Sequence, residues 1–74
     1  MKQKYIRLRE YDEIVIFPIA MNHSIFKFLD PISAGFCEIV ENENKVICYG
    51  ESLSIGMESH KYDSMIASNQ LFGI

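Results

Sequence analysis

The sequence predicts a small α+β fold, in which an antiparallel four-stranded sheet is covered by two short helices in the order β-β-α-β-β-α. Alternating or continuous apolar runs mark four strands, a polar turn separates the last two, and two segments carry apolar residues at helical spacing. A chain of 74 residues has room for one small core, so we expect a single domain over residues 1–74.

The first two strands follow different patterns. Residues 14–17 form a continuous apolar run, which predicts a strand buried on both faces. Residues 5–11 alternate, and residues 12–13 are the expected turn between the two strands. One face of the first strand then carries an aromatic and basic stripe of Tyr5, Arg7, Arg9 and Tyr11. Such a stripe either holds phosphate and stacks on a base, or is simply a solvated strand face.

Helix signals flank the second half of the sheet. Asn22 is a suitable N-cap for a short helix over residues 23–29, and Asp30-Pro31 ends that helix. A second helix is predicted over residues 63–72, with Asp63 as its N-cap and Gly73 as its terminator.

The third and fourth strands, residues 32–40 and 45–55, are joined by the polar turn 41–44. A symmetric turn places Cys37 opposite Cys48, and it fixes the register of every other pair. The same face then continues into glycines and hydroxyls, namely Gly35 opposite Gly50, Ser33 opposite Ser52, and Ser54 beyond them. Glu51 points to the opposite face, which is mostly apolar.

Paired glycines in the middle of a sheet indicate that something approaches the backbone closely. The sequence leaves three candidates open: a helix of the same chain, a partner subunit or a ligand. The two cysteines fit a pair of packed apolar thiols better than a cross-strand disulfide. No spacing of cysteine and histidine matches a zinc site, so we expect no metal and no cofactor.

The net charge and the hydropathy of the chain exclude some classes of binding partner. The net charge of −3 argues against a duplex nucleic acid partner but is compatible with a small anion held by backbone N–H groups and hydroxyls. No apolar run reaches the length of a membrane span, and the first residues are charged rather than typical of a signal segment. The expected location is therefore cytoplasmic.

The segments Phe17-Pro18, Ser33-Ala34-Gly35-Phe36 and Cys48-Tyr49-Gly50-Glu51-Ser52-Leu53-Ser54-Ile55-Gly56, with His23 between them, resemble a group of short uncharacterised phage and prophage proteins. Ser59 and Asp63 extend the resemblance toward the end of the chain. The resemblance implies a small accessory protein in the bacterial host cytosol. Proteins of this kind commonly act against host defence, either by sequestering a nucleotide signal or by binding a host protein.

The leading hypothesis is a non-enzymatic protein that binds and sequesters a small anionic, nucleotide-like signalling molecule as a homo-oligomer. Its candidate ligand-binding residues are Ser33, Gly35, Gly50, Ser52, Ser54, Asn22, His23, Arg7 and Arg9. One alternative is a protein–protein interaction module that uses Phe36, Tyr49, Leu53 and Ile55. Another is a small hydrolase that pairs Ser52 with His23, although the sequence contains no nucleophile-elbow motif.

Overall fold

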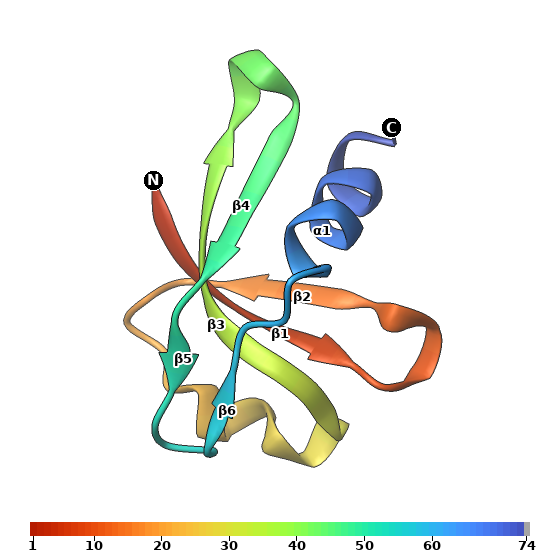
Figure 1. Ribbon diagram of the computed structural model, residues 1–74. Helices are drawn as coiled ribbons and strands as arrows, with labels where there is room; N and C mark the ends of the chain where they lie inside the picture. Colours follow the sequence, from red (N-terminus) through yellow and green to blue (C-terminus); the bar gives the residue numbers. More distant parts are fainter. Residues whose placement is uncertain (74) are drawn as a thin grey trace.

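A computed structural model describes residues 1–73 of the chain. Its main element is an antiparallel four-stranded sheet with the strand order β2-β1-β3-β4 (Figure 1). The sheet strands are β1 (Lys2–Leu8), β2 (Ile14–Phe17), β3 (Pro31–Val40) and β4 (Lys45–Tyr49). A small antiparallel ribbon adds β5 (Glu51–Ser52) and β6 (Met57–Glu58). The helical elements are the 3₁₀ segments η1 (Glu10–Asp12), η2 (His23–Leu29) and η3 (Glu41–Glu43), and α1 (Asp63–Phe72).

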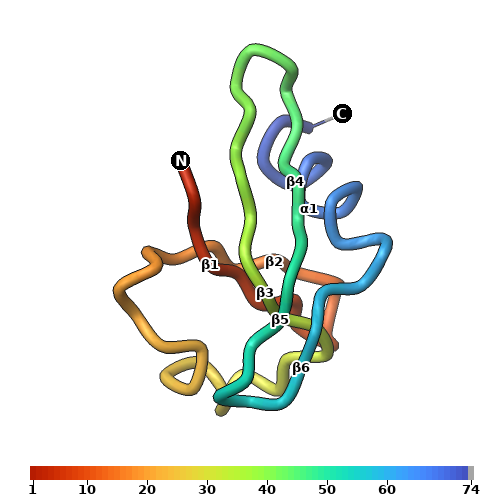
Figure 2. Tube along the Cα trace, turned by 60° about the vertical axis from the view of Figure 1, so that its left-hand side comes forward, coloured from red at the N-terminus to blue at the C-terminus, as the bar shows by residue number. Residues whose placement is uncertain are grey.

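Each face of the sheet has its own apolar cluster. On one face α1 packs over a cluster formed by Tyr5, Ile14, Cys37, Val46 and Ala67. On the other face a second cluster is formed by Ile6, Phe17 and Ala34 together with side chains from η2 and the β5–β6 ribbon. Figures 1 and 2 both show this ribbon beside η2, at the end of the molecule opposite the β3–β4 turn.

Helix α1 also covers parts of the two edge strands of the sheet, β4 and β2. The Ser68 hydroxyl accepts a hydrogen bond from the Val46 N–H at 2.8 Å, and the Ser64 hydroxyl accepts one from the Cys48 N–H at 2.8 Å. On the other edge, the Gln70 amide both accepts from and donates to the backbone of Ile14, at 2.7 Å each. Side chains of one helix therefore occupy polar groups that an open edge would offer to another strand.

The predicted α+β class and antiparallel four-stranded sheet are confirmed, although the predicted order of elements is not matched in full. Strand β1 ends at Leu8 rather than residue 11, because the chain turns through η1, where Tyr11 has a φ of 64°. The Asn22 cap is confirmed, since its side chain accepts from the Ser24 N–H, but the segment that it begins is a 3₁₀ helix. The Gly73 terminator is also confirmed.

Two further corrections concern the C-terminal half. The register is as predicted from Cys37–Cys48 to Phe36–Tyr49, but the pairing with β3 ends there. Of the residues predicted to prolong the fourth strand, Glu51 and Ser52 leave the sheet and pair with β6 instead. Asp63 is the first residue of α1 rather than its N-cap, which is Tyr62 without a side-chain hydrogen bond. Among residues 1–73, no helix has both the length and the apolar character needed to cross a membrane.

Candidate ligand-binding site

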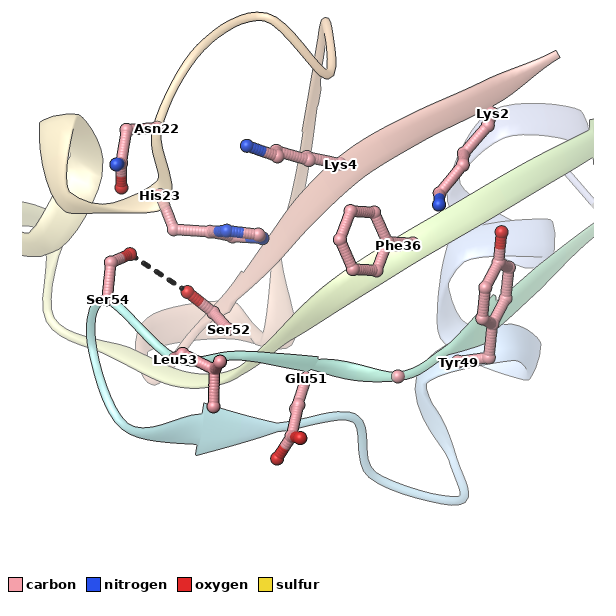
Figure 3. A pocket seen from close by; sticks show the side chains of 11 residues that line it. Lys2, Lys4, Asn22, His23, Phe36, Tyr49, Glu51, Ser52, Leu53 and Ser54 are labelled. Carbon is pink, nitrogen blue, oxygen red and sulfur yellow. Dashed lines mark hydrogen bonds between the residues drawn. The ribbon is translucent and has the colours of Figure 1, made fainter.

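A cavity of about 560 Å³ lies where β1, the start of η2 and the segment after β4 come together (Figure 3). We call it the basic cavity. Its polar lining comes from Lys2, Lys4, Asn22, Ser52 and Ser54. The remaining walls are formed by His23, Phe36, Tyr49, Gly50, Glu51 and Leu53.

Two glycines shape the wall that β4 contributes. Gly50 has a φ of +78°, a conformation that turns the chain away from β3 directly after Tyr49. Gly35 lies under this turn, where a Cβ atom would collide with the backbone carbonyl oxygen of Tyr49. The close approach predicted from the paired glycines is therefore made by the chain's own backbone, as β4 bends toward β5.

The positive charge of the cavity comes from alternate residues of β1. The Lys4 ammonium donates a hydrogen bond to the Met21 carbonyl oxygen at 2.8 Å, which leaves two of its three N–H donors for other partners. The Lys2 ammonium lies 4.3 Å from the centroid of the Phe36 ring. Within residues 1–73 neither lysine forms an ion pair, and the Glu51 carboxylate points away from the cavity (Figure 3).

His23 forms a neutral inner wall. Its side chain is buried, and Nε2 lies 2.9 Å from the Gly35 carbonyl oxygen, so Nε2 carries the proton and donates it. Burial lowers the pKa of His23 below its usual value, and the neighbouring Lys4 charge acts in the same direction. The ring contacts Phe17 and Phe36 edge-on, with centroids 5.4 and 6.0 Å away. His23 therefore contributes shape and rigidity rather than positive charge.

The hydroxyl side of the cavity is formed by the segment after Gly50. The Ser52 side chain is buried, and its Oγ lies 3.2 Å from the Ser54 Oγ. No hydrogen bond joins either serine to His23 in the described part of the chain, and the His23 ring bonds to the Gly35 carbonyl oxygen instead. The site therefore holds hydroxyl donors and acceptors without the serine–histidine pair that a nucleophilic hydrolase uses.

The sequence-predicted site residues fall into two groups. Asn22, His23, Gly50, Ser52 and Ser54 line the basic cavity. The others lie outside its lining. Gly35 is beneath the cavity, where its carbonyl oxygen holds His23.

The remaining predicted residues belong to ion pairs or to the opposite face. Arg7 donates to the Asp63 carboxylate at 2.7 Å on the α1 face, and it also pairs with Asp12. Ser33 is buried on that same face, opposite Arg7 in the register. Arg9 pairs with Asp30 at 2.9 Å on the surface. The predicted stripe of aromatic and basic residues is therefore not a surface, because Tyr5 is fully buried.

Buried Asp63 organises this second polar group. It accepts hydrogen bonds from the Tyr5 hydroxyl, from Arg7 and from the His60 N–H. Burial alone raises the pKa of the Asp63 carboxyl, but these donors outweigh burial and hold the pKa below its usual value. The carboxylate is therefore ionised at neutral pH and anchors the start of α1 to β1.

Sequence reasoning missed Lys2, Lys4, Phe36 and Tyr49 as parts of one site. A signal for the lysines was present, since Lys2, Lys4 and Ile6 alternate on one face of a strand that extends further toward the N-terminus than predicted. Phe36 and Tyr49 were correctly paired, and their ring centroids are 6.2 Å apart. No pattern in the sequence predicted the turn at Gly50, which brings Ser52 and Ser54 beside these rings.

The cysteines lie on the α1 face, away from the cavity. Cys37 and Cys48 are both free thiols. Burial raises the pKa of Cys37 to about 11 and that of Cys48 to about 12, so both are protonated at neutral pH. No group of three or more metal-ligating side chains occurs within residues 1–73. Comparisons of the chain with protein-family models, curated proteins and solved structures found no significant match.

Proposed function

We propose that the chain is a non-enzymatic protein that binds a small anionic, nucleotide-like molecule in the basic cavity. The observation that carries this proposal is the convergence of Lys2 and Lys4 on a cavity with aromatic walls. Both ammonium groups lack a carboxylate partner within residues 1–73, although the whole chain has a net charge of −3. A local positive site in an acidic protein favours a compact anion over a polyanion such as duplex DNA.

The other wall groups fit the same ligand class. The Ser52 and Ser54 hydroxyls can donate to phosphate or sugar oxygens, and Asn22 adds an amide group at the rim. Phe36 and Tyr49 offer ring surface on which a nucleobase can stack. Because His23 is neutral, the positive charge of the cavity comes from Lys2 and Lys4 alone.

The resemblance to short phage and prophage proteins favours one role for such binding. The ligand would be a nucleotide signal of bacterial defence, and the protein would sequester it as a sponge in the cytoplasm of the host. We further propose that the active form is a homo-oligomer. Large apolar side chains such as Phe28 and Leu53 are 80% and 86% exposed, and a chain this short gains burial from association. Light scattering that shows only monomer would remove the oligomer from the proposal.

Isothermal titration calorimetry with a panel of linear and cyclic nucleotides tests the binding itself. We expect saturable binding that weakens as salt is added, because the lysines act through charge. The double variant Lys2→Met/Lys4→Met should lose most of the affinity while it keeps the apolar parts of both side chains.

The matched control is Lys27→Met/Lys61→Met, which changes the net charge equally at two exposed positions outside the cavity. Equal losses in the two double variants would mean that only overall charge matters, and would contradict the assignment of the site. An absence of heat with every nucleotide would reject the proposed function.

A protein–protein interaction module is the second candidate, because Leu53 is 86% exposed at the rim of the cavity beside partly exposed Tyr49. The structure narrows the apolar surface predicted from the sequence, since Ile55 packs into the second core cluster. A pull-down from host lysate separates the two candidates. Retention of a single protein that is lost with Leu53→Ser but kept with Lys2→Met/Lys4→Met would favour this alternative.

A further inference from the structure

The position of Lys2 over Phe36 indicates which chemical groups the ligand must combine. The Lys2 ammonium lies 4.3 Å from the Phe36 ring centroid, and the lysine side chain is otherwise exposed. Phe36 is only half-buried and lines the cavity, and its ring lies between His23 and Lys2 (Figure 3). In the free protein, the chain's own lysine thus occupies the ring surface of the site.

This contact is weak enough to be exchanged. A cation over an aromatic ring at an exposed position contributes less to stability than a base stacked on an aromatic side chain contributes to binding. A ligand ring can therefore take the place of the ammonium on Phe36. The displaced Lys2 is on the same strand face as Lys4, two residues away, so both cations can then meet one anionic group.

We propose that Lys2 exchanges the Phe36 ring for the anionic group of a ligand whose planar ring replaces it on Phe36. The ligand class is then a planar aromatic ring joined to a phosphate or similar anion, and neither part alone suffices for tight binding. This inference rests on the proposed function, because it concerns the same cavity. It adds that binding begins with the release of an internal contact.

Three probes test the two-part requirement by calorimetry: adenosine, ribose 5-phosphate and adenosine 5′-monophosphate. We expect the nucleotide to bind at least about tenfold more tightly than either part, as stacking and charge contributions combine. Equal affinity for ribose 5-phosphate and the nucleotide would overturn the inference and leave a simple anion site, so the proposed function would survive. No binding by any probe would count against both.

Two variants each remove one half of the site, either the aromatic ring of Phe36 or the ammonium of Lys2. Phe36→Leu keeps an apolar side chain and should lower nucleotide affinity to that of ribose 5-phosphate, without changing the affinity for ribose 5-phosphate. Lys2→Met keeps the stem and should weaken nucleotide binding about five- to tenfold, while adenosine binds at least as well, because no ammonium competes for the ring. Phe28→Leu is the matched control, since Phe28 is 80% exposed and lies outside the cavity.

Nuclear magnetic resonance reads the exchange directly. The ε-methylene protons of Lys2 should resonate upfield in the free protein, because the ammonium to which this methylene is bonded lies over the Phe36 ring. Saturation with adenosine 5′-monophosphate should move them back toward the usual lysine position. An unchanged upfield signal at saturation would show that Lys2 stays on Phe36, and would overturn the inference even where the nucleotide binds.

Discussion

The two faces of the sheet both carry charged side chains from β1, but the charges are paired with a carboxylate on one face and unpaired on the other. On the α1 face, Arg7 is paired with Asp63, which is fully buried and also accepts from Tyr5. On the other face, Lys2 and Lys4 line an open cavity without a carboxylate partner within residues 1–73. Buried charge has to be paired, whereas charge beside water can be left for a ligand. Stability should therefore depend on the α1 face and ligand binding on the cavity face.

The largest effect that would test this division is expected at Asp63. Asp63→Ala removes the acceptor for Tyr5 and Arg7 and leaves Arg7 partly buried without its main partner. We expect a loss of about 3–5 kcal/mol in the free energy of unfolding, measured by urea titration and circular dichroism. A chain of 74 residues has only about 4–11 kcal/mol in total, so this variant will be largely unfolded under mild stress.

The matched control for this prediction is Asp30→Asn, which removes the charge from the exposed pair with Arg9 but keeps a residue type that tolerates the φ of 57° at this position, so it should cost at most about 1 kcal/mol. Asp63→Asn, which keeps a hydrogen-bond acceptor, should fall between the two. Similar losses at Asp63 and Asp30 would break the comparison, since they would mean that the α1 face carries no special share of stability.

The next effect is expected at Gly35, which lies between the two regions. A methyl group added there would collide with the Tyr49 carbonyl oxygen, so Gly35→Ala should cost about 1–3 kcal/mol. It should also displace Tyr49 and Gly50 and thus change the wall of the basic cavity. Amide shifts in two-dimensional NMR spectra should change at residues 49–50, whereas Asn42→Ala, at an exposed position in the β3–β4 turn, should leave residues 49–50 unchanged.

The same two regions show what the sequence could and could not predict. Strand alternation and the turn at residues 41–44 were sufficient to place Cys37 opposite Cys48 and Phe36 opposite Tyr49. These are local rules, and they apply wherever the ladder is regular. Extending the ladder past Tyr49 was wrong, because Gly50 adopts a positive φ and ends the pairing. Nothing in the hydrophobic pattern reports such a change of direction.

The prediction of the site residues was also limited to what local sequence patterns can show. Asn22, His23, Ser52 and Ser54 were selected as polar groups near the hairpin, and they do line one cavity. Arg7 was selected for its charge alone, but its role depends on Asp63, which is 56 residues away in the sequence. A long-range ion pair of this kind leaves no periodic signal, so one sequence cannot distinguish a free arginine from a buried one.

A smaller effect is expected where α1 closes the edge of β4. Ser68→Ala removes the acceptor of the Val46 N–H and should cost about 1 kcal/mol in the free energy of unfolding. Because part of a strand edge is then uncovered, we also expect more self-association in analytical ultracentrifugation. Asn69→Ala, at an exposed neighbouring position, should change neither quantity. Equal self-association in both variants would mean that α1 does not protect this edge.

The most gradual effect is expected from pH, and it concerns the cavity face through His23. Burial holds the pKa of folded His23 below the value of 6.5 that it has in an unfolded chain. Between these two pKa values the unfolded state binds more protons, so the free energy of unfolding decreases as the pH falls. The contribution of His23 is complete above pH 6.5 and is lost as the pH falls through the folded pKa. Asp63 acts with the same sign at lower pH, because its folded pKa lies below 3.8.

Variants at the two histidines identify the source of this slope. His23→Gln keeps a side-chain donor for the Gly35 carbonyl oxygen but cannot titrate, so its stability should be nearly constant between pH 7 and about pH 5, where the parent chain loses stability. One proton limits the slope in the parent to about 1.4 kcal/mol per pH unit. His60→Gln, at an exposed position, should keep the slope of the parent chain. If His60→Gln abolished the slope and His23→Gln retained it, the neutral inner wall assigned to His23 would be wrong, and the cavity would carry a third positive charge at mildly acidic pH.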